Sequence, residues 1–141
     1  MIISQLSIFL ENKSGRLHEV FDVLGREGIN VSACSVADTS EFGILRMIVS
    51  NPEKALNILK EKKFSVNISE VISFATPNIA GALAKTLKIM SDAQISIEYI
   101  YGFSLGEKSF IVLRCDNIST AIEELKSHEM ELISANDLYK F

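Results

Sequence analysis

Apolar residues recur along the chain in two spacings, one typical of helices and one typical of strands. The first helical run puts four apolar side chains on one face, at positions i, i+3, i+4 and i+7: Leu17, Val20, Phe21 and Leu24. Gly28 predicts the end of this helix, because glycine tolerates the positive φ that closes many helices. Residues 29–38 and 42–50 then predict two β-rich strands, joined by a hairpin at the polar residues 39–41.

A second helix completes the first half of the chain, and the second half then repeats this order of elements. A helix begins at Asn51 and Pro52, a capping residue followed by a residue suited to a first turn, and runs to about residue 63. After it we predict a helix over residues 79–92 and strands over residues 95–104 and 109–115. The last helix begins at residue 118 and again carries an i, i+3, i+4, i+7 stripe: Ile118, Ala121, Ile122 and Leu125.

The two halves align at a constant offset of 66 positions. The segments "ENKSGRLHEVFDVLGREGINVSA" and "TPNIAGALAKTLKIMSDAQISIEY" share few identical letters, but their apolar pattern agrees. The offset pairs Asn12 with Asn78, Gly15 with Gly81, Leu17 with Leu83, and Ile29 with Ile95. The chain is therefore predicted to contain two copies of one structural unit.

Each copy has the element order βαββαβ, with residues 64–76 supplying both the last strand of the first unit and the first strand of the second. We therefore predict the α+β class. Two ferredoxin-like units, residues 1–68 and 69–141, are expected to pack side by side, with antiparallel sheets of about eight strands and helices on one face. Apolar sheet surface left over from this packing leads us to expect a homodimer.

Composition narrows the function. The chain has 141 residues and a formal net charge of −4, without the basic footprint of a nucleic-acid-binding protein. No apolar run is long enough to cross a bilayer and the N-terminus does not resemble a secretory signal, so we expect a cytoplasmic protein that binds no membrane. Cys34 and Cys115 are interpreted as buried, reduced thiols. Neither a metal site nor a cofactor is predicted.

The loops before the two aligned helices offer a binding site. A helix start presents free backbone N–H groups and the positive end of a dipole, which favour an anion such as a carboxylate. Gly15 and Gly81 lack the Cβ that would keep a ligand from this backbone. Asn12 and Asn78 precede the loops with amides that can cap a turn, or donate to a carboxylate and accept from an ammonium group.

At these residues the chain resembles the ACT domain family, a small-molecule-sensing regulatory module. In that family a strand ends at Asn or Asp, a short turn with glycine opens a helix, and the helix gives way to Gly-Ile-Asn. The resemblance covers nearly the whole chain and implies a stand-alone tandem-ACT protein. It departs from the family pattern where proline usually precedes the glycine, which here is Ser14 and Ala80, and where Asn30 is matched by Ser96.

The resemblance implies an amino acid ligand, bound between the strand-to-helix loop of one unit and the first residues of the facing unit's second strand. The first-copy positions are Asn12, Ser14, Gly15, Arg16, Leu17, Asn30 and Val31. Those of the second copy are Asn78, Ile79, Ala80, Gly81, Ala82, Leu83, Ser96 and Ile97. With Asn30 behind it, the first loop is the better match to the family pattern. A non-catalytic sensor that regulates an enzyme or other protein in trans is the function implied.

Two other functions on the same fold stay open. An acylphosphatase-like hydrolase would cradle phosphate with Arg16 and either Asn30 or Asn12, but the second copy has Ala82 in place of the arginine. An RNA-binding module of the RRM type would stack bases on sheet aromatics, for which the middle strands offer Tyr99, Tyr101, Phe103 and Phe110. Titration with amino acids, acyl-phosphate hydrolysis and salt-dependent RNA retention separate the three.

Overall fold

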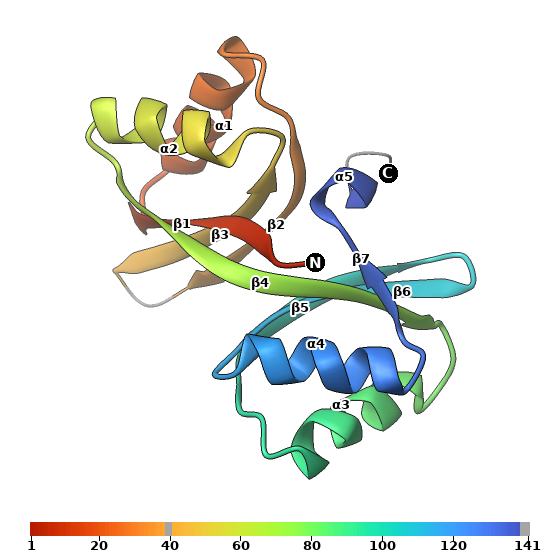
Figure 1. Ribbon diagram of the computed structural model, residues 1–141. Coiled ribbons are helices and arrows are strands. Elements are labelled where there is room, and N and C mark those ends of the chain that lie inside the picture. The colour runs from red at the N-terminus through yellow and green to blue at the C-terminus, as the bar shows by residue number, and fades with distance from the viewer. Residues whose placement is uncertain (39–40, 139–141) are drawn as a thin grey trace. The chain divides into compact units, whose positions relative to one another are not determined.

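The computed structural model describes residues 1–38 and 41–138, which form seven strands and five helices (Figure 1). The strands are β1 (Ile3–Glu11), β2 (Val31–Asp38), β3 (Phe42–Val49), β4 (Ser65–Pro77), β5 (Ile97–Leu105), β6 (Lys108–Cys115) and β7 (Glu131–Ile133). The helices are α1 (Arg16–Arg26), α2 (Pro52–Glu61), α3 (Ala82–Asp92), α4 (Ile118–Ser127) and α5 (Ala135–Leu138). The predicted α+β class is confirmed. The first two residues of the predicted hairpin turn, 39 and 40, lie outside the described residues.

One compact unit comprises Ser4–Ser69. Its strands follow the order β2-β3-β1-β4, and β3 pairs antiparallel with both β1 and β2. Helices α1 and α2 pack on one face of this sheet (Figure 1), where they bury the predicted stripe residues Val20 and Leu24 against β1. Each fully buried side chain of this size contributes about 1.5–3 kcal/mol, so the apolar stripe holds the helix to the sheet.

A second compact unit comprises Met1–Ile3 and Glu70–Leu138. Its strand order is β7-β4-β6-β5, and each of these neighbouring pairs is antiparallel. The core between this sheet and helices α3 and α4 contains Phe74, Met90, Leu113, Ala121 and Leu125. With βαββαβ order in each unit and β1 or β4 beside the last strand, both units have the ferredoxin-like arrangement.

Strand β4 belongs to both units and explains the strand count. Residues 65–69 of this single strand lie in the first unit and residues 70–77 in the second. Two separate four-stranded units would have given the expected eight strands. Because β4 closes one unit and opens the next without interruption, the structure has seven.

The backbone hydrogen bonds repeat at the offset of 66 that the sequence shows. Asn12 N–H donates to the carbonyl of Glu41 at 2.9 Å, and Asn78 N–H donates to that of Glu107 at 2.8 Å. The same repetition holds at the second helix of each unit. There the side chain of Asn51 accepts from Lys54 N–H, and that of Asn117 accepts from Thr120 N–H, both at 3.2 Å. The weak letter-by-letter alignment therefore reflects a close backbone repeat.

Gly15 and Gly81 begin α1 and α3 in a left-handed conformation, with φ of 90° and 86°. The turns before them are closed by equivalent bonds, from Arg16 N–H to Lys13 O at 3.3 Å and from Ala82 N–H to Ile79 O at 3.2 Å. Helix α3 thus begins at Ala82 and not at the predicted residue 79, because residues 79–81 form this turn. A Cβ added at either glycine would meet nothing within 4 Å, so the backbone angle, and no neighbouring atom, demands glycine.

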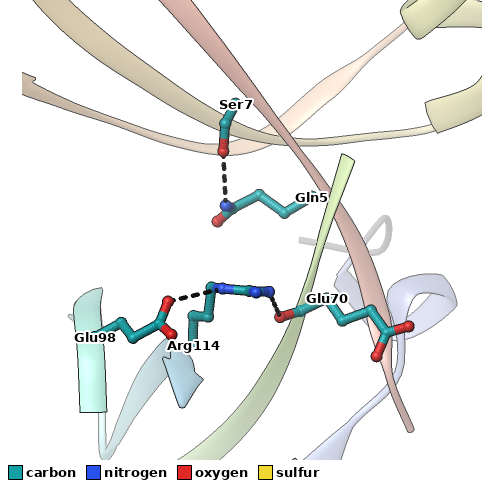
Figure 2. A network of polar contacts seen from close by, with 5 residues as sticks. All are labelled: Gln5, Ser7, Glu70, Glu98 and Arg114. Carbon is teal, nitrogen blue, oxygen red and sulfur yellow. Dashed lines mark hydrogen bonds and ion pairs between the residues drawn. The ribbon is translucent and has the colours of Figure 1, made fainter. Parts of the chain in front are cut away.

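A solvent-exposed polar network ties the strands of the second unit together. Arg114 Nε donates to Glu98 Oε2 at 2.8 Å, and its Nη1 donates to the carbonyl of Glu70 at 3.0 Å (Figure 2). Arg114 therefore links β6 to β5 and β4. Figure 2 also shows the fully buried Gln5 of the first unit, whose Nε2 donates to Ser7 Oγ at 3.5 Å.

The prediction that both cysteines are buried is wrong for Cys34, which is exposed, whereas Cys115 is buried. Cys34 lies on β2, the edge strand of its unit, where the helices do not cover the sheet. Burial raises the pKa of the Cys115 thiol. Because the pKa is raised, folding favours the protonated thiol. This contribution to the free energy of unfolding is fully present below the pKa that the thiol has in the unfolded chain. It is lost as the pH rises through the thiol's pKa in the folded protein.

This difference predicts selective thiol reactivity. The thiolate is the reactive form, so Cys34 should react with Ellman's reagent in the native protein at pH 8 while Cys115 should react only after unfolding. Counting released thionitrobenzoate should give one thiol per chain natively and two in guanidinium. A Cys34→Ser variant should give none natively. Rapid native modification of that variant would contradict the burial of Cys115.

The two positive-φ glycines predict a stability pattern. Gly15→Ala and Gly81→Ala should each lower the free energy of unfolding by about 1–2 kcal/mol, because a Cβ is strained in the left-handed region. Gly25→Ala is the matched control: it lies within α1 with open space around its Cβ, and should stabilise by about 0.5–1 kcal/mol. Urea unfolding followed by circular dichroism measures all three. Equal effects at residues 15 and 25 would remove the conformational explanation.

Candidate functional site

The predicted site residues fall into two places in each unit. The loop residues precede α1 or α3, and most are exposed, Ile79 with 70% of its surface. Asn30 and Ser96 stand before the second strand, where their backbones pair with Ser50 and Asp116 at 2.9–3.1 Å. Val31 and Ile97 follow them, partly buried. Within each unit, therefore, Asn30 or Ser96 bonds to the residue that follows the third strand, and not to the loop before the helix.

The loop and the strand start lie at opposite ends of the second strand of their unit. Asn12 donates through Nδ2 to Asp38 Oδ1 at 3.1 Å, at the far end of β2 from Asn30. An eight-residue strand spans roughly 25 Å. Asn78 likewise donates through Nδ2 to the carbonyl of Gly106 at 3.0 Å, beyond the end of β5. A single unit thus brings its loop to the hairpin between its second and third strands.

Each helix start leaves backbone donors without partners. Among the described residues, the N–H groups of Leu17 and His18 have no hydrogen-bond acceptor, and neither do those of Leu83 and Ala84. The first helix bonds close only at the next residue, where Glu19 donates to Gly15 O and Lys85 to Gly81 O. These unpaired donors lie at the positive end of each helix dipole, so both loops can bind a carboxylate through backbone alone.

Side chains make the first loop strongly charged. Arg16 Nη1 donates to Glu19 Oε2 at 2.8 Å, and its guanidinium carbon lies 5.0 Å from the ring centre of Phe64. Lys13 pairs with Glu11 at 2.8 Å and, through that hydrogen bond and its charge, lowers the pKa of the Glu11 carboxyl. Arg16 is thus engaged by its own helix and by Phe64, and Asn30 lies far from it, so the acylphosphatase arrangement gains no support.

The second loop has the same backbone with apolar side chains. Where the first has Glu11, Lys13 and Arg16, the second has Pro77, Ile79 and Ala82. Three hollows adjoin it, one of them a space of about 330 Å³ lined by Thr76, Pro77 and charged side chains that include Glu107, Lys108 and Glu131. A cavity of about 300 Å³ is lined by the loop and by strands β5 and β6, and a wider depression of about 790 Å³ is lined by the start of α3 together with His128 and Met130.

Sequence reasoning missed several residues that line these hollows: Thr76, Gly102, Ser104, Ser109, His128 and Met130. Thr76 and Gly102 had a signal in the repeat itself, since the offset of 66 sets them against Leu10 and Val36. Among the described residues no group of three or more histidine, cysteine or acidic side chains could hold a metal ion. None of their helices combines the length and the apolar character needed to span a membrane.

Known proteins resemble this chain along its full length. A comparison with curated proteins gives no match. The crystal structure of protein BT0572 from Bacteroides thetaiotaomicron is 49% identical, with a TM-score of 0.95, over 100% of this chain and 98% of that one. The ligand-free regulatory subunit of aspartate kinase from Thermus thermophilus is 15% identical, with a TM-score of 0.67, over 88% of this chain and 91% of that one.

The regulatory subunit of aspartate kinase from Thermus flavus is 14% identical, with a TM-score of 0.66, over 99% of this chain and 95% of that one. At such low identity the two kinase subunits show a shared fold. The family is identified by sequence, because the model of the ACT domain pair matches residues 1–141. This chain, with its two βαββαβ units and its two glycine-started helices, belongs to the ACT domain pair family.

Proposed function

We propose that this chain is a non-catalytic sensor, with ACT domains at residues 1–68 and 69–141, that binds a free amino acid and regulates a partner protein in trans. The observation that carries the proposal is the match of the whole chain to the ACT domain pair. The unpaired N–H groups at the starts of α1 and α3 support it, because they suit the α-carboxylate that every amino acid carries.

An enzyme is the partner that the comparisons favour. Two structures with the same fold are regulatory subunits of aspartate kinase, proteins whose names place them with a catalytic partner. A ligand can bias such a partner only through different affinities for its two states, and coupling of this kind is typically about 1–3 kcal/mol. The proposed role is therefore to change the affinity for a partner enzyme by a factor of about 5–150 when the amino acid binds.

Ligand binding is tested by isothermal titration against the standard amino acids and their keto acids, backed by thermal unfolding. A true ligand at a hundred times its Kd should stabilise the protein by about 2.7 kcal/mol and raise its Tm by several degrees. The D-enantiomer of the best ligand is the matched small-molecule control, and it should give a much smaller shift. A folded protein that responds to no compound of this panel would contradict the proposal.

We also propose a homodimer. Each unit has a tilted aromatic pair on its sheet with at least one exposed ring: Phe9 with Phe42 at 5.8 Å between ring centres, and Phe103 with the buried Phe110 at 5.5 Å. Phe9 and Phe103 are each about half exposed. Exposed aromatic surface of this kind is common where a protein meets a partner.

The assembly is checked by light scattering after size exclusion. We expect twice the chain mass of 15.6 kDa. Phe103→Ser should shift the equilibrium toward the monomer, because it removes apolar surface from the proposed contact. Exposed Phe42→Ser tests the other unit in the same way. A wild-type protein that elutes as a monomer at micromolar concentration would exclude the dimer.

A further inference from the structure

The two copies differ in bulk and polarity at one place where their backbones agree. In the first unit Leu10 pairs across the sheet with Gly43, and in the second Thr76 pairs with Ser109 at the equivalent register. One strand further out, Val36 of the first unit is replaced by Gly102. Two of these differences, Leu10 to Thr76 and Val36 to Gly102, replace an apolar side chain with a smaller one, and the third, Gly43 to Ser109, adds a hydroxyl group.

In the first unit this space is filled by side chains. Leu10 is 5% exposed and belongs to the hydrophobic core. Val36 covers the neighbouring glycine, since its Cγ1 lies 3.4 Å from where a Cβ at Gly43 would be. Leucine and valine offer no side-chain hydrogen bond, so the first unit has the buried Leu10 and the half-exposed Val36 where the second has a hydroxyl group and a glycine.

In the second unit the same space is a cavity of about 300 Å³ with hydroxyl groups in its wall. Thr76 is 3% exposed, and its Oγ1 has no hydrogen-bond partner among the described residues. The hydroxyls of Ser104 and Ser109 bond to each other at 2.7 Å. A buried hydroxyl without a partner is costly and rare, so the unpaired Thr76 Oγ1 calls for a group that the protein itself does not supply.

The cavity wall also limits the charge of that group. In the described part of the chain no Asp, Glu, Lys or Arg lines it, and Ile79, Leu83 and Ile111 are among its apolar residues. A charged side chain placed there would find no counter-ion in this wall, so a neutral one suits it better. Leu83, whose backbone N–H is unpaired at the start of α3, also lines the cavity, so a carboxylate can be bound at its rim.

We propose that the second unit, not the first, holds the ligand, and that this ligand is a small neutral amino acid with a hydroxyl or amide side chain that pairs with Thr76. This inference rests on the proposed function. The loop sequences alone favour the first unit as the binding site, because its loop matches the family pattern better. The proposal favours the second unit, because the position of Thr76 is occupied in the first unit by the core residue Leu10. The wider depression beside α3 is a weaker candidate, since its buried Thr86 hydroxyl already donates to Ala82 O at 3.4 Å.

The test compares ligands that differ only in the predicted hydrogen bond. Wild-type protein is titrated with L-threonine against the isosteric L-valine, and with L-asparagine against L-leucine. The polar member of at least one pair should bind about tenfold tighter or better, because an isostere leaves the buried hydroxyl unpaired. L-Lysine and L-aspartate should bind more weakly than that ligand.

Thr76→Val is the decisive variant. It should bind the polar ligand about tenfold more weakly, while its ligand-free Tm stays equal to or above that of wild type, because the change removes an unpaired buried hydroxyl. Thr86→Val is the matched control in the same unit. It removes a bonded hydroxyl, so it should lower the ligand-free Tm and leave the affinity unchanged.

Three results would overturn the inference. Thr76→Val with wild-type affinity would do so, as would a charged amino acid binding tightest. Loss of binding in Arg16→Ala together with retention in Thr76→Val would assign the ligand to the first loop and leave the proposed function standing. If wild type binds no amino acid or keto acid, the proposed function itself fails, and this inference fails with it.

Discussion

Both units depend on one backbone constraint, which is the left-handed residue that turns a strand into a helix within a few residues. At Gly15 and Gly81 the positive φ lets the chain reverse while the preceding asparagine stays bonded to the hairpin between the second and third strands. The turn also fixes where the helix begins, and so which N–H groups remain unpaired. The binding chemistry of each loop therefore follows from a conformation that an L side chain adopts only at a cost.

Identical backbones do not make equivalent sites. The first loop surrounds its helix start with charged side chains, where Lys13 pairs with Glu11 and Arg16 pairs with Glu19. Leu10 of the hydrophobic core precedes this loop. The second surrounds the same backbone with proline, isoleucine and alanine, and leaves space over Thr76. A repeat of this kind keeps one backbone geometry in both copies while the side chains around it differ.

The periodicity of apolar residues sufficed to predict helices α1 to α4 and the repeat, because a helix that buries one face carries apolar residues at regular spacing. It did not predict the short helix α5, which has only four residues. The place of Gly15 and Gly81 at the helix starts could also be predicted, since few other residues adopt a positive φ. Exposure of Cys34 was not, because its strand reads as apolar and nothing in the spacing shows that it lies at the edge of its sheet. Nor could the helix start at Ala82 be separated from the turn before it.

The candidate site was only half predictable for a related reason. Residues 78–83 are consecutive in the sequence, so the sequence alone could assign them to one candidate site. Thr76, Gly102, Ser104 and Ser109 come from three strands, and their meeting depends on sheet register, which a single sequence does not state. The offset of 66 does align Leu10 with Thr76. Only the strand pairing shows that Thr76 lies beside Ser109 in the sheet.

Gly102 makes the open space in the second unit hard to reverse by mutation. A Cβ at this position would lie 2.2 Å from the carbonyl oxygen of Phe110 and 3.0 Å from Ile111 Cδ1, so the main chain of β6 has moved into the volume that a side chain would need. A valine at position 102 would therefore collide with the neighbouring strand before it filled any open space. The position of the β6 backbone thus requires glycine here, whatever occupies the hollow beside it.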